Sequence, residues 1–367
     1  MSSLFRNLIT LVVFLPRALA SPLMQLPHVI PRAVDDFECF NASLPNITIY
    51  ATGGTIAGSA GSADQTTGYQ SGALGIKTLI EAVPQLCNVS NVRGIQIVNV
   101  DSGDINSTIL TNLTQHIQKD LDNPLIQGAV VTHGTDTLEE SAFFLDLTIA
   151  SEKPVVVVGS MRPATALSAD GPINLLSAVK LAVNKNAKGR GTMIVLNDRI
   201  ASARFTVKTN ANAVDTFKAE EQGFLGVLEN INPLFFYPPS RPLGHHYFNI
   251  TTRAFQTPMP KVDVLYGHQE VSPEIFQAAV DNGAKGIVLA GLGAGYWPSA
   301  ALKSLEEVVN KTGIPVVASR RTAWGYVEGQ EWGINAGYLN PSKSRIQLQL
   351  ALENKLSNQE IRSIFEL

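Results

Sequence analysis

The feature that most constrains this chain is a strand pattern that ends in two adjacent glycines with a threonine on either side. Residues 47–51 show the two-residue alternation of a β-strand. Gly53 and Gly54 then allow the backbone to turn sharply where a side chain would clash. In an α/β sheet such a turn lies at the ligand-binding edge, so Thr52 and Thr55 are candidates for ligand contact.

Three interpretations of this run stay open when it is taken alone: an ordinary tight turn, a phosphate cradle and a site with a reactive threonine. The spacing of the two glycines fits neither the dinucleotide fingerprint nor the P-loop, and no Gly-Lys-Ser/Thr follows. The rest of the chain must therefore decide between them.

Composition limits the classes of fold and partner. The chain has 367 residues, of which 45% are hydrophobic and 16% charged, which predicts a large core and two domains. The formal net charge is -3, and there is no long basic run. A nucleic-acid or anionic-membrane partner would need such a basic surface. We therefore expect a globular protein that acts on a small molecule.

The first 20 residues have the pattern of a signal peptide. Arg6 precedes an apolar run over residues 8–15, and small residues lead to a predicted cleavage site after Ala20. A short membrane anchor is the alternative, but the run is well below the roughly 20 residues that span a bilayer. We predict a secreted protein, extracellular or held in a cell wall.

Secretion has consequences for two residue types. Cys39 and Cys87 would reach an oxidising compartment that permits a disulfide, with two free buried thiols as the alternative. Sequons for N-glycosylation begin at Asn41, Asn46, Asn88, Asn106, Asn112, Asn249 and Asn310. Their number favours a glycoprotein, although each motif alone is a weak signal.

Strand patterns alternate with helical ones along the first half of the chain. After a proline-containing arm over residues 21–43, strands are predicted at 47–51, 95–100, 129–132, 155–158 and 193–196. This order predicts an α/β fold with a doubly wound, mostly parallel sheet. Polar turns follow three of the later strands, and turns after parallel strands share one edge of the sheet. We expect these turns to gather beside Thr55.

Two of the segments near this edge also carry helix signals. Thr137 and Glu140 have the spacing of a capping box, which explains those two residues but not Thr135 or Asp136 just before them. A second helix opens at Ser168-Ala169-Asp170-Gly171-Pro172, with the proline in its first turn. Thr135 and Asp136 are therefore free to bind or orient a ligand.

The chain is predicted to divide into an N-terminal domain over residues 44–232, a linker over 233–258 and a C-terminal domain over 259–367. Several prolines and glycines indicate the linker. Beyond it, a smaller α/β unit has strands at 262–266, 287–290 and 316–318. Its last helix carries a capping box at Ser357 and Glu360.

Four motifs in this order resemble those of the bacterial-type L-asparaginases, specifically the secreted type II enzymes. They are the run from Thr52 to Gly58, His133 to Glu140, Met161-Arg162-Pro163 and Ser168 to Pro172. The likeness extends from about Leu44 to the C-terminus. It implies two α/β domains, a homotetramer and no cofactor or metal.

The resemblance also implies a set of site residues. Thr55 corresponds to the nucleophile and Tyr69, in the polar loop over residues 59–72, to a lid tyrosine that assists it. Thr135, Asp136 and Lys185 correspond to a second catalytic group. Substrate contacts are implied for Asp101, Ser102, Thr135, Asp136 and Glu328, the last supplied by a neighbouring subunit. Lys185 alone would otherwise be taken as a solvated charge after a helix.

The implied reaction is acyl transfer from L-asparagine to a threonine, with release of ammonia and then of L-aspartate. A threonine hydroxyl needs a base within hydrogen-bond reach, and Tyr69 or the Thr135–Lys185 pair would supply it. The sequence leaves open which threonine, Thr55 or Thr135, is acylated. Two alternatives also remain: a mixed glutaminase-asparaginase and a non-catalytic amino-acid-binding or cell-wall protein. Gly103 stands where many bacterial relatives have glutamine, which removes one substrate hydrogen bond and argues against a glutamine preference without settling the first alternative.

Overall fold

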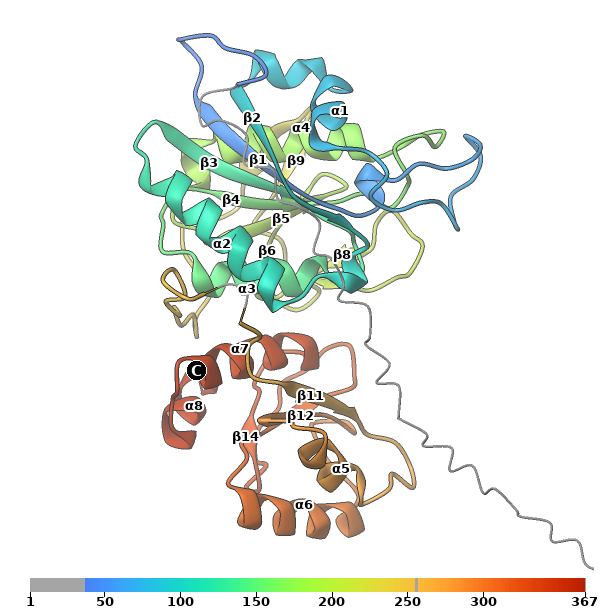
Figure 1. The fold of residues 1–367 in the computed structure, drawn as a ribbon, viewed down its shortest axis with the longest axis vertical. Coiled ribbons are helices and arrows are strands. Elements are labelled where there is room, and N and C mark those ends of the chain that lie inside the picture. Colours follow the sequence, from blue (N-terminus) through green and yellow to red (C-terminus); the bar gives the residue numbers. More distant parts are fainter. Residues whose placement is uncertain (1–36, 255–256, 367) are drawn as a thin grey trace, which may run out of the picture.

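A computed structural model describes residues 37–254 and 257–366, which form two α/β domains, one above the other in Figure 1. The predicted signal peptide and most of the predicted N-terminal arm lie outside the described residues. No helix in the described ranges is long and apolar enough to cross a membrane.

The N-terminal domain is built on an eight-stranded sheet with the order β10-β9-β6-β5-β4-β3-β1-β2. Strands β1 to β5 are mutually parallel, and β6, β9 and β10 extend the sheet in antiparallel fashion. The strands are β1 (Asn46–Gly53), β2 (Asn91–Val100), β3 (Ile126–Thr132), β4 (Val155–Val158), β5 (Thr192–Leu196), β6 (Arg199–Ser202), β9 (Gly226–Glu229) and β10 (Asn232–Phe235). The predicted doubly wound sheet is confirmed.

Helices cover both faces of this sheet and complete two apolar cores. One core packs α1 (Ile76–Glu81) and α4 (Gly171–Ala182) against the sheet, and the other packs α2 (Ser107–Asp122) and α3 (Leu138–Thr148). Helix α2 begins where the side chain of Asn106 accepts a hydrogen bond from the backbone of Ile109, which caps its N-terminus. Short 3-10 turns connect these elements: η1 (Thr55–Ala57), η2 (Pro84–Asn88), η3 (Ser102–Asp104) and η4 (Lys185–Ala187).

The C-terminal domain has a four-stranded parallel sheet in the order β11-β12-β13-β14. Its elements are β11 (Val262–Tyr266), α5 (Ile275–Asp281), β12 (Gly286–Gly291), α6 (Ser299–Thr312), β13 (Val316–Arg320), β14 (Ile334–Asn335), α7 (Pro341–Glu353) and α8 (Asn358–Phe365). The capping box predicted at Ser357 and Glu360 opens α8.

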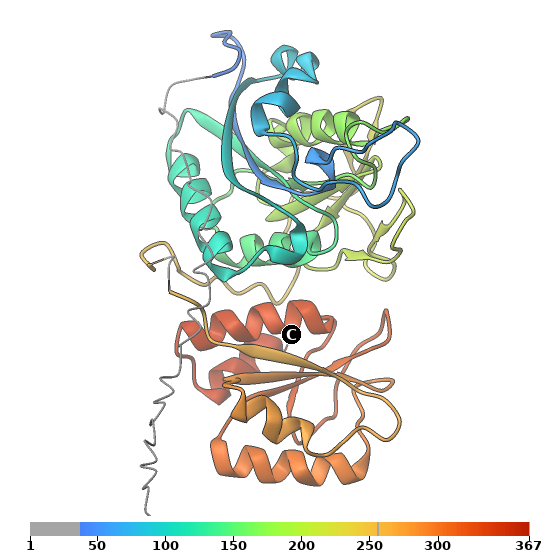
Figure 2. The ribbon, with the colours of Figure 1, turned by 45° about the vertical axis from the view of Figure 1, so that its right-hand side comes forward.

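The two domains share one apolar core along a pair of helices. Phe143 and Phe144 of α3 belong to the same buried cluster as Ile346 and Leu350 of α7. Helix α7 forms the top of the C-terminal domain and faces the N-terminal domain in both views (Figures 1 and 2). Because this core is apolar and fully buried, it fixes the C-terminal domain beneath α3.

Two sequence predictions need correction. The sequence predicts that residues 233–235 belong to the linker. In the structure they belong to β10, where Pro233 pairs with Leu228 of β9. An edge strand tolerates that proline because one side of it makes no ladder bonds. The capping box at Thr137 and Glu140 does not form. The Thr137 hydroxyl instead donates to the backbone oxygen of Ser102, 2.7 Å away.

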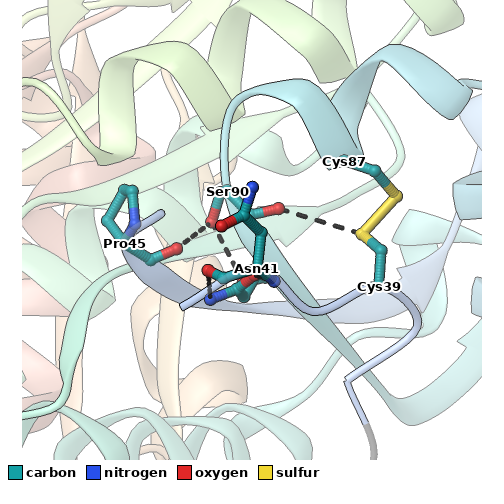
Figure 3. Close-up of a disulfide and its surroundings, with 6 residues drawn as sticks. Cys39, Asn41, Pro45, Cys87 and Ser90 are labelled. Atoms are coloured by element: carbon teal, nitrogen blue, oxygen red, sulfur yellow. Dashed lines mark hydrogen bonds between the residues drawn. A yellow bond between two sulfur atoms is a disulfide. The ribbon is translucent and has the colours of Figure 1, made fainter. Parts of the chain in front are cut away.

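A disulfide joins Cys39 to Cys87, so the free-thiol alternative is wrong (Figure 3). It connects the segment before β1 to η2. The neighbouring Asn41 supports the same connection, since its backbone nitrogen donates to the side chain of Asn91 at the start of β2. The predicted sequon at Asn112 lies in α2, where the asparagine is 7% exposed, so the folded chain does not present it for modification.

Candidate active site

The carboxyl ends of four adjacent parallel strands open into one cavity of about 650 Å³. This size is within the usual range of small-molecule sites. The residues that follow these strands and line the cavity are Thr55 after β1, Asp101 and Ser102 after β2, Thr135 and Asp136 after β3, and Met161 and Arg162 after β4. The expectation that these turns gather beside Thr55 is confirmed.

Two glycines allow the turns of β1 and β3 to meet. A Cβ atom on Gly54 would lie 2.2 Å from backbone atoms of Gly134, a distance that no side chain tolerates. Gly54 also has φ 80° and ψ -173°, a conformation that is essentially restricted to glycine. The glycine pair therefore brings the threonines that follow, Thr55 and Thr135, to the same cavity.

The first polar contact in the cavity joins Thr55 to Tyr69. The hydroxyl oxygens of the two side chains are 2.7 Å apart, a hydrogen-bonding distance. Thr55 is 9% exposed, and Tyr69 reaches it from the polar loop that folds back on η1. A backbone pair between Ser59 and Gln70 closes that loop. The predicted pairing of these two residues is thus present in the structure.

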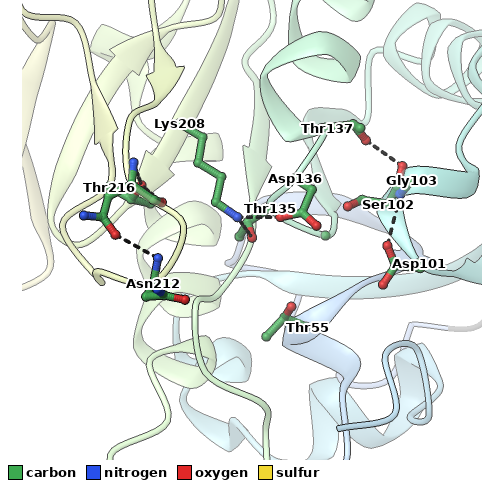
Figure 4. A network of polar contacts seen from close by, with 12 residues as sticks. Thr55, Asp101, Ser102, Gly103, Thr135, Asp136, Thr137, Lys208, Asn212 and Thr216 are labelled. Carbon is green, nitrogen blue, oxygen red and sulfur yellow. Dashed lines mark hydrogen bonds and ion pairs between the residues drawn. The ribbon is translucent and has the colours of Figure 1, made fainter. Parts of the chain in front are cut away.

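The second polar group is Thr135, Asp136 and Lys208, which Figure 4 shows together. The Nζ atom of Lys208 lies 2.9 Å from Oγ1 of Thr135 and 2.5 Å from Oδ1 of Asp136. The prediction that Lys185 makes these contacts is wrong. Lys185 is exposed in η4 and does not line the cavity.

Lys208 was missed because its local sequence has no periodic signal. It lies in β7 (Val207–Lys208), which pairs with β8 (Phe217–Lys218) in a two-stranded ribbon outside the main sheet. The buried Glu139 accepts a hydrogen bond from the Lys208 backbone nitrogen with one oxygen, 2.5 Å away, and from Asn340 of the C-terminal domain with the other, 2.8 Å away. Tertiary contacts, rather than local pattern, therefore place this lysine.

Three further side chains of the cavity offer polar atoms to a ligand. Asp101 accepts a hydrogen bond from the Gly103 backbone, which holds the η3 turn. Ser102 is buried and lines the cavity. Ser71, which the sequence interpretation did not select, also lines it, and within the described ranges its buried Oγ atom has no hydrogen-bond partner.

The buried His133 supports the turn that carries Thr135. Its Nδ1 atom lies 2.7 Å from the backbone oxygen of Gly134. Burial lowers the pKa of His133 to about 4, so its imidazole is neutral near pH 7. A neutral imidazole that donates through Nδ1 leaves Nε2 unprotonated.

Two family models cover this chain in succession. The model described as "Asparaginase, N-terminal" matches residues 46–241, and the one described as "Glutaminase/Asparaginase C-terminal domain" matches residues 261–365. The chain belongs to the asparaginase family. The second match begins at residue 261, just before β11.

Named relatives in the asparaginase family cover most of the chain. "L-asparaginase 2-3" of Saccharomyces cerevisiae is 48% identical over 98% of this chain and 97% of its own length. "L-asparaginase 2" of Bacillus subtilis is 47% identical over 88% of this chain and 86% of its own length. A crystal structure of "Probable Cytoplasmic L-asparaginase from Campylobacter jejuni" superposes with a TM-score of 0.82 at 42% identity, covering 88% of this chain and 99% of that one.

Glu328 is not brought to the cavity by this chain. It is exposed between Val327 and Gly329 in the C-terminal domain and does not line the cavity. Its predicted role depends on a neighbouring subunit and stays a prediction. Among the residues that the structure describes, no group of three or more His, Cys, Asp or Glu could hold a metal ion.

Proposed function

We propose that this chain hydrolyses the side-chain amide of L-asparagine, giving L-aspartate and ammonia, with Thr55 as the nucleophile. The observation that carries the proposal is the placement of two polar groups in one cavity. Thr55 is hydrogen-bonded to Tyr69. Thr135 is hydrogen-bonded to Lys208, which also forms an ion pair with Asp136. Each threonine thus has a partner that can accept or deliver a proton.

The first half-reaction transfers the aspartyl group to Thr55. As the Thr55 oxygen attacks the amide carbon, the Tyr69 hydroxyl accepts the Thr55 proton and passes its own proton to the amide nitrogen. The carbon–nitrogen bond then breaks, and the protonated nitrogen leaves as ammonia. Backbone N–H groups beside Thr55 and Thr135 stabilise the oxyanion, a contribution of roughly 3 kcal/mol per donor. The N–H of Gly54 is not among them because it donates to Val100.

The second half-reaction returns the enzyme to its starting state. Water attacks the ester carbon on Thr55 while the Thr135 hydroxyl, to which Lys208 donates, takes a proton from the water and passes its own proton to the Thr55 oxygen. The ester bond then breaks to free aspartate and the Thr55 hydroxyl. Asp136 orients Lys208 through their ion pair. Because the Asp136 side chain is 71% exposed, it also offers an oxygen to the α-ammonium group of the substrate.

Recognition of the α-carboxylate is assigned to the serine hydroxyls of the cavity. Ser102 and the unpartnered hydroxyl of Ser71 are donors there, and Asp101 fixes the turn that holds Ser102. A hydroxyl bonded to a carboxylate contributes more than one bonded to a neutral group. Substrates that lack the α-carboxylate should therefore bind poorly.

Secretion and assembly belong to the same proposal. The signal-peptide pattern and the Cys39–Cys87 disulfide support an extracellular or cell-wall location. N-terminal sequencing of the secreted protein should begin at Ser21. Exposed aromatic side chains at Tyr266, Tyr296 and Tyr326 support a subunit interface on the C-terminal domain. Sedimentation is expected to give a homotetramer.

The test of the reaction is ammonia release from L-asparagine and from L-glutamine. The wild-type protein should turn over asparagine, and Thr55→Ala should lose more than about 10³-fold in kcat while remaining folded. Equal turnover of glutamine would change the assignment to a mixed glutaminase-asparaginase, since one methylene is worth only about 1–3 kcal/mol in a pocket. If the folded protein released no ammonia from either amide, the assignment as an enzyme would be overturned in favour of an amino-acid-binding protein.

A further inference from the structure

A small cavity between the two domains brings three cationic side chains together away from the candidate active site. Arg204 comes from the N-terminal domain, four residues before Lys208, and Arg320 and Lys343 come from the end of β13 and the first turn of α7. None of the nine residues that line this cavity is acidic. Such a cluster is unusual because like charges repel and carboxylates normally separate them.

All three side chains are removed from water. Arg204 is 4%, Arg320 3% and Lys343 1% exposed. Lys343 donates to the backbone oxygen of Thr206, and Arg320 donates through Nη1 to the backbone oxygens of Tyr338 and Leu339. These carbonyl contacts satisfy some donors but supply no negative charge.

Several donors in the cluster have no acceptor. Within residues 37–254 and 257–366, Nε and Nη1 of Arg204 and Nε of Arg320 are buried without a hydrogen-bond partner. A buried donor without an acceptor is unfavourable, and a buried charge without a counterion more so. Arg204 is therefore the strongest indication that a negatively charged group is needed here.

Carboxylates act on all three cations from outside the cavity: Asp146 on Arg204, Glu221 on Arg320, and Glu139 and Glu140 on Lys343. Three of these carboxylates are engaged by other donors. Asp146 accepts from the backbone of Thr192, Glu139 accepts from Lys208 and Asn340, and Glu140 pairs with Arg345. The pKa of Lys343 is lowered to about 8, chiefly by burial and also by the positive charges of Arg204 and Arg320, against the opposing effect of Glu139 and Glu140. Burial likewise lowers the pKa of Arg204 to about 10. Both groups remain predominantly charged near pH 7.

We propose that Arg204, Arg320 and Lys343 form a binding site for one small monovalent inorganic anion, chloride in ordinary solution. The cavity volume of about 10 Å³ is at the lower limit for a single water molecule and excludes a carboxylate metabolite or a phosphate. A chloride ion is larger than a water molecule, so its binding requires the side chains that line the cavity to move slightly apart. A chloride ion accepts from several donors without a fixed direction, so it suits guanidinium and ammonium groups that approach from two domains.

The position of this anion site gives it a structural consequence. Lys343 contacts the backbone at Thr206, two residues before Lys208, whose own backbone is held by Glu139. An anion between Arg204 and Lys343 would attach this segment of the N-terminal domain to α7. It would thereby stabilise the junction of the domains and the strand that carries Lys208.

Bromide substitution tests occupancy directly in the full-length protein. Crystals of the wild-type protein grown with sodium bromide in place of chloride should give an anomalous peak among Arg204, Arg320 and Lys343. The absence of a peak at saturating bromide would overturn the proposal. Density for a water molecule, or for a carboxylate from a neighbouring subunit, at this position would also overturn it. None of these results depends on turnover, so they are separate from any failure of the proposed hydrolysis.

A thermal unfolding series tests the energetic consequence. At constant ionic strength, replacing sodium gluconate with sodium chloride should raise the Tm of the wild-type protein by about 2–6 °C. Arg204→Met should lose this shift and, in gluconate, should be at least as stable as the wild type because an unpaired buried charge has been removed.

A matched control separates the site from general charge effects. Arg345→Met removes a nearby cation that lies outside the cavity and should keep the full chloride shift. If Arg204→Met is insoluble, Lys343→Met serves in its place. If chloride raised the Tm of the wild-type protein and of the cavity variants by the same amount, a specific anion site would be contradicted.

Discussion

Lys208 places its side-chain nitrogen 2.9 Å from the hydroxyl oxygen of Thr135, in the cavity that Thr55 also lines. Replacing Lys208 with methionine keeps the length of the side chain and removes the charge and the proton relay. We expect kcat for asparagine to fall by about 10²–10⁴-fold, the usual effect of losing an acid–base group. Lys185→Met is the matched control and should keep wild-type kinetics because Lys185 is exposed and outside the cavity. A large loss of kcat in Lys185→Met with wild-type kinetics in Lys208→Met would support Lys185, the lysine assigned from the sequence.

The contrast between Thr135 and Lys208 shows how far the sequence could be interpreted. Thr55 and Thr135 follow strands with clear periodicity, and the rule that parallel strands end at one edge places them together without a structure. Lys208 lies in a two-residue strand that local pattern cannot identify, and Glu139 and Asn340 position it from outside its own ribbon. The predicted start of the linker at residue 233 was wrong for a related reason. Pro233 indicated a break, although an edge strand accepts proline.

The close approach of Gly54 and Gly134 predicts a strong effect from a single methyl group. Gly54→Ala should destabilise the protein by at least about 3 kcal/mol, through strain at φ 80° and through displacement of the Gly134 backbone. It should also reduce kcat/KM by more than about 10²-fold because Thr55 and Thr135 would separate. Urea unfolding and ammonia release measure the two effects.

Gly223→Ala is the control for backbone strain alone. Gly223 has a similar φ of 76°, but no atom lies within 4 Å of an added Cβ. We expect a loss of only about 1–2 kcal/mol with unchanged kinetics. Equal effects of the two alanine substitutions would show that the glycine contact is not what brings the turns together.

The buried His133 predicts a loss of stability in mild acid. Its pKa is about 4 in the folded chain, against an ordinary value of 6.5. Between pH 6.5 and pH 4, the unfolded chain therefore binds a proton at this residue that the folded chain does not bind. The contribution of the neutral His133 to the free energy of unfolding is fully present above pH 6.5. It decreases by about 3 kcal/mol as the pH falls towards 4. His133→Asn keeps a donor for Gly134 but does not titrate. Urea unfolding from pH 7 to pH 4 should give a shallower pH dependence for this variant, and identical curves would refute the assignment.

The Cys39–Cys87 disulfide predicts a stability effect that is separate from catalysis. It spans 48 positions of sequence and attaches the segment before β1 to η2, away from the cavity. The double variant Cys39→Ser, Cys87→Ser should lose about 2–4 kcal/mol, chiefly because the unfolded chain gains freedom. Its kinetics at 25 °C should match those of the wild type. A large fall in kcat with unchanged stability would mean that the disulfide supports the site instead.

The assignment of Thr55 as nucleophile is tested most directly by locating the covalent intermediate. Wild-type protein and the Lys208→Met variant, in which hydrolysis of the ester should be slow, are mixed with asparagine, quenched in acid within the first turnover, digested and sequenced by mass spectrometry. The predicted result is one aspartyl group in ester linkage to Thr55, absent from Thr55→Ala. An aspartyl group on Thr135 with Thr55 unmodified would contradict the mechanism and exchange the roles of the two threonines.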